Sequence, residues 1–138
     1  MILFIDDDIR VMDTYVGDLR ASGYDAHQER TVDEGLKFLR ENFGQIDVLV
    51  LDIMMDEGGN FSDADIQNGL RTGVFLFEKI RDEHPELPVV ILTNVSAEPV
   101  EMAFAGRPRC LFLLKPDWYA FELVEEIKAM AQTNIKGN

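Results

Sequence analysis

Apolar runs and amphipathic segments alternate along the whole sequence. Four runs are apolar enough to be buried strands of a parallel sheet, since both faces of such strands are covered. A weaker fifth segment, Tyr24–Gln28, mixes polar and apolar residues and is predicted as an edge strand. The four apolar runs are Ile2–Ile5, Ile46–Leu51, Val89–Leu92 and Leu111–Leu114.

The segments between the first strands show the spacing of apolar positions that is typical of helices. The first predicted helix ends near Ser22-Gly23, and its buried face carries Ile9, Met12, Val16 and Leu19. The second begins after Thr31, a favourable N-cap residue, and ends around residues 42–44. Its predicted buried face carries Val32, Leu36 and Leu39.

Three more helices are predicted in the second half of the sequence. The pattern favours a helix over Val74–Arg81 and another within Ala97–Ala105, which Gly106 ends. Asp117 is predicted to cap a last helix, whose buried face carries Phe121, Val124 and Ile127. Strands that alternate with helices in this way predict a single α/β domain over residues 1–138, with helices on both faces of a parallel sheet.

One connection is much longer than the others. Links in compact α/β units usually have about 2–6 residues, whereas Ile53–Thr72 separates a predicted strand from the next predicted helix. The sequence predicts an acidic inserted loop at about residues 55–71. Because the segment follows the carboxyl end of a strand, we expect it to lie over the edge of the sheet where such folds hold their sites.

The composition limits which functions and which cellular locations are expected for the protein. With 13 Lys and Arg against 26 Asp and Glu, the net charge of −13 would repel a phosphate backbone, so direct nucleic-acid binding is not expected. No apolar run approaches the roughly 18 residues of a membrane-spanning helix, and no secretory signal is recognised. A lone cysteine, Cys110, is consistent with a reducing compartment. We therefore expect a cytoplasmic protein without membrane insertion.

Polar residues follow four of the predicted strands directly. The first strand is followed by Asp6 and Asp7, the third by Asp52, the fourth by Thr93 and the fifth by Lys115. The carboxyl ends of parallel strands meet at one edge of a sheet, so these side chains are predicted to converge.

Three crowded carboxylates need a positive charge beside them. Two carboxylates about 4 Å apart repel by roughly 4 kcal/mol at an effective dielectric near 20. Lys115 supplies one cation, and a hard divalent ion with oxygen ligands supplies more. Mg²⁺ suits such a site, because it binds few carboxylates and keeps waters that a phosphate can replace.

Four segments carry this pattern together: an acidic cluster, a single Asp, a Thr and a Lys-Pro pair, each after a strand. They are Ile2–Asp8, Val48–Met55, Val89–Thr93 and Phe112–Pro116. The combination resembles the response-regulator receiver domain, the phosphoacceptor module of two-component signalling, in its chemotaxis-type single-domain form. The resemblance covers nearly the whole chain.

The resemblance implies a fold and a set of metal ligands. The fold would be a flavodoxin-like, doubly wound α/β/α sandwich with five helices and a five-stranded parallel sheet of order 2-1-3-4-5. Asp52 would be the phosphoacceptor. The ligands of Mg²⁺ would be Asp6, Asp7, Asp52 and the backbone carbonyl of Met54.

The same resemblance implies a switch and its partners. Thr93 and Lys115 would bind phosphoryl oxygens, and Phe112 would change rotamer on activation. A sensor histidine kinase or a phosphotransfer protein would donate the phosphoryl group. A downstream target protein would bind the face formed by the fourth helix, fifth strand and fifth helix. The protein would catalyse only its own phosphorylation and dephosphorylation.

Two positions depart from the family pattern. Asp56 stands where a proline is common, and Asn94 stands after Thr93 where a small residue is favoured. We hypothesise that Asn94 slows exchange of the phosphoryl group with solvent and partners. The lifetime of the aspartyl phosphate would measure this effect.

Two other functions are alternatives. Asp6-Asp7-Asp8 after a strand also fits a haloacid-dehalogenase-like phosphatase that uses Asp6, although Arg10 stands where that motif has Thr or Val. Asp52 would then have no role. The second alternative is a pseudo-receiver, an interaction domain that keeps the fold without being phosphorylated.

Overall fold

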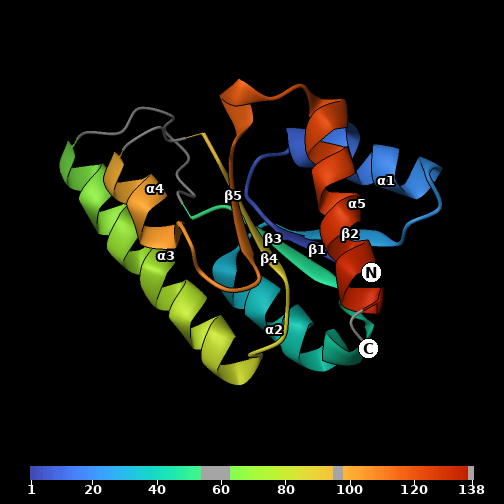
Figure 1. Ribbon diagram of the computed structural model, residues 1–138, viewed down its shortest axis with the longest axis horizontal. Helices are drawn as coiled ribbons and strands as arrows, with labels where there is room; N and C mark the ends of the chain where they lie inside the picture. Colours follow the sequence, from blue (N-terminus) through green and yellow to red (C-terminus); the bar gives the residue numbers. More distant parts are fainter. Residues whose placement is uncertain (54–62, 95–97, 137–138) are drawn as a thin grey trace.

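The computed structural model describes residues 1–53, 63–94 and 98–136 of the chain (Figure 1). Five parallel strands form one sheet in the order β2-β1-β3-β4-β5, which confirms the predicted order. The strands are β1 (Ile2–Ile5), β2 (Ala26–Glu29), β3 (Val48–Leu51), β4 (Val89–Thr93) and β5 (Cys110–Leu114).

Helices cover both faces of this sheet (Figure 1). The α-helices are α1 (Gly17–Ala21), α2 (Val32–Asn42), α3 (Asp63–Glu83), α4 (Glu98–Phe104) and α5 (Ala120–Lys136). Three short turns are η1 (Met12–Val16), η2 (Phe43–Gln45) and η3 (Lys115–Asp117). Helices α2, α3 and α4 pack on one face, and η1, α1 and α5 pack on the other. No helix in the described part of the chain is long and apolar enough to cross a membrane.

The two buried clusters follow from the alternation of side chains along the strands. In β1, Leu3 and Ile5 face α2 and α3, whereas Ile2 and Phe4 face η1 and α5. All four residues of β1 are buried, as expected for a strand with helices on both sides. This packing places the carboxyl end of every strand at the same edge.

The predicted buried face of the first helix is partly wrong. The residues that pack inward are Val11, Tyr15, Val16 and Leu19, whereas Ile9 is 67% exposed and Met12 is 40% exposed. Ile9 lies in a turn before the helix, and the π-helical turn η1 begins at Met12. Its hydrogen bonds span five residues instead of four, so the inward face shifts relative to a regular helix.

The last helix begins later than predicted. Residues Lys115–Asp117 form the turn η3, so Asp117 does not cap the helix. Instead the backbone N–H of Tyr119 donates to the carboxylate of Glu122. The later start turns Phe121 outward, where it is 64% exposed, and α5 buries Leu123, Val124, Ile127 and Ala131.

Helix α3 is longer than predicted. It begins at Asp63, so residues 63–71 of the predicted inserted loop are helical, while residues 54–62 lie outside the described part. Acidic residues in a first turn favour a helix, and Ile66, Leu70 and Val74 recur at helical spacing. Gly73 lets α3 approach Ile53 closely, because a Cβ there would lie only 2.6 Å from the Cβ of Ile53.

Other predicted boundaries are confirmed. Thr31 caps α2 by accepting a hydrogen bond from the backbone N–H of Glu34. Gly106 ends α4 with a φ of +72°, a conformation that glycine adopts without strain.

Candidate functional site

Three carboxylates meet at the carboxyl edge of the sheet. Asp6 and Asp7 follow β1 and Asp52 follows β3, and one oxygen from each lies within 4.8 Å of the others. The register of the sheet brings them together, because Ile5 pairs with Leu51 and the backbone N–H of Asp52 donates to the carbonyl of Ile5 at 3.0 Å. Asp6 and Asp52 are both buried.

Lys115 places its ammonium group between the two buried acids. Its Nζ lies 2.8 Å from Oδ2 of Asp6 and 4.0 Å from Oδ2 of Asp52. Burial by itself would lower the pKa of Lys115, but the charge and hydrogen bond of Asp6 and the charge of Asp52 raise it above its ordinary value. Lys115 is therefore a fixed positive charge in this site.

Asp7 is less buried than Asp6 and Asp52, and its pKa is shifted. Burial, followed by the charge of Asp6, raises the pKa of Asp7 above its ordinary value. At this position the loss of hydration and the repulsion by Asp6 outweigh the attraction of Lys115. Carboxylate oxygens that converge in this way are the hard ligands that Mg²⁺ prefers, so the residues fit a divalent cation.

The third acid of the N-terminal cluster lies outside this group. The guanidinium of Arg10 hydrogen-bonds the Asp8 carboxylate, with Nη2 2.8 Å from Oδ2, and this contact lowers the pKa of Asp8. Asp8 also accepts from the backbone N–H of Arg10 at 2.9 Å, which is the capping geometry of a helix start. The Asp8 carboxylate is thus bound by Arg10, its neighbour in the sequence.

Thr93 is the last residue of β4 and is fully buried. It pairs in register with Leu114, the residue before Lys115. Its neighbour Asn94 is exposed and lines a cavity of about 220 Å³ together with Tyr15 and Lys115. The edge of the sheet therefore brings a hydroxyl-bearing residue next to the strand end that carries the ammonium group.

Sequence reasoning missed two residues, one in β2 and one directly after it. The side-chain amide of Gln28 donates to the backbone carbonyls of Asp6 and Asp8. The guanidinium of Arg30 donates to the carbonyl of Asp7. Polar residues in a weakly apolar strand were the only sequence signal of these contacts.

The comparisons with known proteins rest on structure, since neither a protein-family model nor a curated protein matches the sequence. A CheY-like response regulator receiver domain protein from Methanospirillum hungatei JF-1 superposes with a TM-score of 0.75 at 22% identity, over 99% of this chain and 97% of that one. A response regulator receiver domain protein from Clostridium thermocellum gives 0.70 at 25% identity, over 99% and 98%.

This chain has the response regulator receiver fold. The chemotaxis protein CheY4 of Vibrio cholerae has it too, with a TM-score of 0.68 at 18% identity over 94% of this chain and 96% of that one. In this receiver fold the acidic cluster occupies the carboxyl edge of the sheet, as the sequence predicted. Of the predicted metal ligands, Met54 lies outside the described residues, as does the departure at Asp56.

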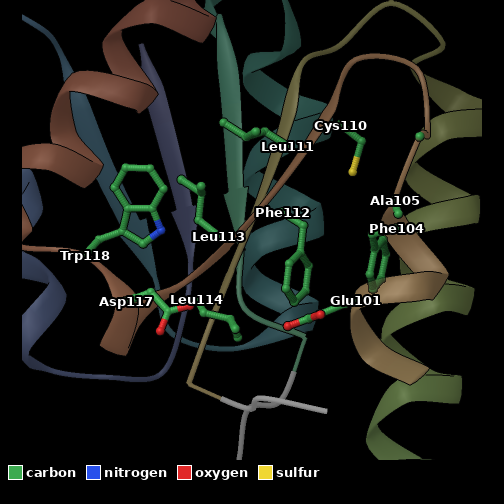
Figure 2. A pocket seen from close by; sticks show the side chains of 11 residues that line it. Glu101, Phe104, Ala105, Cys110, Leu111, Phe112, Leu113, Leu114, Asp117 and Trp118 are labelled. Atoms are coloured by element: carbon green, nitrogen blue, oxygen red, sulfur yellow. The ribbon is translucent and has the colours of Figure 1, made fainter. Parts of the chain in front are cut away.

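A groove on the same receiver fold contains Phe112. It has a volume of about 450 Å³ and lies over β5 between α4 and the start of α5 (Figure 2). The Phe112 ring is half-buried and stacks on Phe104 of α4, with ring centres 6.2 Å apart. Among the residues that line the groove, the charged ones are Glu101 and Asp117, both acidic.

Proposed function

We propose that this chain is a response regulator receiver domain that accepts a phosphoryl group on Asp52. One observation carries the proposal: the Asp52 carboxylate lies with Asp6 and Asp7 in one cluster, 4.0 Å from the ammonium of Lys115. The receiver fold supports it. The donor would be a histidine kinase or a phosphotransfer protein, and the cytoplasmic location predicted from the sequence is part of the proposal.

The proposed reaction is an in-line transfer. A carboxylate oxygen of Asp52 attacks phosphorus, the bond from phosphorus to the donor nitrogen breaks, and its electron pair stays on that nitrogen. Lys115 offsets the negative charge of the phosphoryl oxygens. When bound by Asp6, Asp7, Asp52 and the carbonyl of Met54, Mg²⁺ supplies further positive charge at these oxygens.

The proposed signal is a change in shape near the groove. Phosphorylation adds about two negative charges, which give Thr93 and Lys115 a new partner. A shift of the end of β4 toward the phosphoryl group would make room for Phe112 to turn inward. The face formed by α4, β5 and α5 would then bind a downstream target protein. A complete switch from 1:99 to 99:1 needs about 5.5 kcal/mol of differential stabilisation.

Mass spectrometry after incubation with acetyl phosphate and Mg²⁺ tests the proposal. We expect the wild-type protein to gain one phosphoryl group, and Asp52→Asn to gain none. Asp82→Asn, an exposed aspartate on α3, is the matched control and should react like the wild type.

Other outcomes select the alternatives. A wild-type protein that gains no phosphoryl group would favour the pseudo-receiver. A phosphoryl adduct that survives Asp52→Asn and is lost in Asp6→Asn would favour the phosphatase.

A further inference from the structure

The edge strand β2 contributes no carboxylate to the acidic cluster, but it holds the loop that carries two of the three acids. The amide nitrogen of Gln28 lies 2.7 Å from the carbonyl oxygen of Asp6 and 3.0 Å from that of Asp8. Arg30 donates to the intervening carbonyl of Asp7 from Nη2 at 3.1 Å and from Nε at 3.3 Å. Three consecutive carbonyls therefore accept hydrogen bonds from side chains that belong to β2 or follow it.

These contacts determine where the carboxylates point. A peptide whose carbonyl is held toward β2 has little freedom to rotate, so the adjoining side chains are aimed at the site. The backbone N–H of Asp8 also donates to Oδ1 of Asp6 at 3.0 Å, and this short turn needs the same backbone conformation. The mutual repulsion of the acids would otherwise separate them.

Burial makes Gln28 the stronger of the two contacts. Gln28 is only 9% exposed, so water does not readily replace its hydrogen bonds, whereas the contacts of Arg30 lie at the surface. Loss of the amide would leave the carbonyls of Asp6 and Asp8 without this donor. Such unsatisfied buried groups cost more than the net gain from one hydrogen bond.

We propose that Gln28 is a positioning residue for the divalent cation, and that it sets the affinity of the acidic cluster for Mg²⁺ by clamping the loop Asp6–Asp8. The proposal rests on the proposed function, because that function assigns Mg²⁺ to these acids. It adds that an edge strand outside the site determines how well the metal is bound.

Calorimetric titration of the purified protein with MgCl₂ tests the clamp without any phosphodonor. The variants are Gln28→Met, which keeps the length, and Gln28→Glu, which keeps the shape but removes the donor. We expect the dissociation constant for Mg²⁺ to rise by about 10- to 100-fold in both, as is typical for residues that orient metal ligands. Arg30→Met, at the surface, should give a smaller rise in the same direction.

His27→Gln is the matched control, because His27 neighbours Gln28 on β2 but stacks on Phe38 instead of contacting the loop. It should bind Mg²⁺ like the wild type. Thermal unfolding of each variant separates loss of folding from loss of affinity, and Arg30→Met gives a readout if Gln28→Met does not fold.

Three outcomes would overturn the inference. Equal Mg²⁺ affinity in the wild type and the Gln28 variants would show that Gln28 does not position the metal ligands, and would leave the proposed function intact. An equal loss of Mg²⁺ affinity in His27→Gln would show that any change in β2 weakens Mg²⁺ binding, so that Gln28 would have no specific role. A wild-type protein that binds no Mg²⁺ would remove the metal from the proposed function as well.

Discussion

The acidic cluster and the groove differ in burial and in charge pairing. In the cluster, Asp6 is buried, the side chain of Lys115 is only 9% exposed, and their charges are joined by a 2.8 Å ion pair. In the groove, Cys110, Leu111 and Phe112 of β5 are only half-buried. Charged groups withdrawn from water need partners in defined positions, whereas apolar groups at a surface do not.

The position of each region in the sheet accounts for this difference. The acids follow β1 and β3, which are central strands with neighbours on both sides. Among the described residues, strand β5 lies at an edge of the sheet and pairs only with β4, so its side chains are covered less completely. This fold therefore joins a buried, charge-paired cluster at central strands to a less covered apolar surface at an edge strand.

The largest expected effect concerns the ion pair between Lys115 and Asp6 in the acidic cluster. In Lys115→Met, we expect the free energy of unfolding at neutral pH without Mg²⁺ to fall by about 3 kcal/mol, because the buried Asp6 loses its partner. Urea unfolding measures the change. Lys37→Met is the control, since Lys37 is exposed and lies 4.0 Å from Glu41, and such pairs contribute at most about 1 kcal/mol. Equal losses in both variants would contradict a charge-paired cluster.

Phe112 and the only tryptophan of the chain test the groove. Trp118 lines the groove with Phe112, so its fluorescence should change when acetyl phosphate and Mg²⁺ are added. We expect Phe112→Ala to abolish this change and to lower the free energy of unfolding by about 2 kcal/mol, through loss of the stack on Phe104. Phe75→Ala, an exposed position on α3, should leave both quantities unaltered. A fluorescence change that persists in Phe112→Ala would separate the groove from the acidic cluster.

The smallest expected effect is the pH dependence that Asp7 contributes. Because the folded pKa of Asp7 is raised, the folded state without metal binds more protons than the unfolded state, and stability falls as the pH rises through the ordinary value of 3.8 toward the folded pKa. Asp7→Asn in EDTA should therefore be more stable than the wild type near neutral pH. The difference should vanish below pH 3.8.

Urea unfolding at several pH values measures this difference. Added Mg²⁺ should stabilise the wild type more than Asp7→Asn, because the bound cation favours the ionised carboxylate. A variant as stable as the wild type at every pH would contradict the raised pKa of Asp7.

Local patterns in the sequence predicted much of the fold. Continuous apolar runs located the strands, and Thr31 and Gly106 marked helix ends that the structure confirms. The predictions failed where a helix departs from regular spacing or begins after an extra turn, as for the exposed Ile9 and Phe121. Acidic and glycine residues likewise concealed the first turns of α3.

The sequence by itself determined which chemical groups stand at the strand ends, because a buried strand and the residue that follows it are read from adjacent positions. Only the tertiary structure decided that Lys115 pairs with Asp6 and that Gln28 holds the backbone on both sides of Asp7. These contacts join residues that are far apart in the chain and depend on register, direction and burial. No local pattern encodes them, since they form only when the strands are packed side by side.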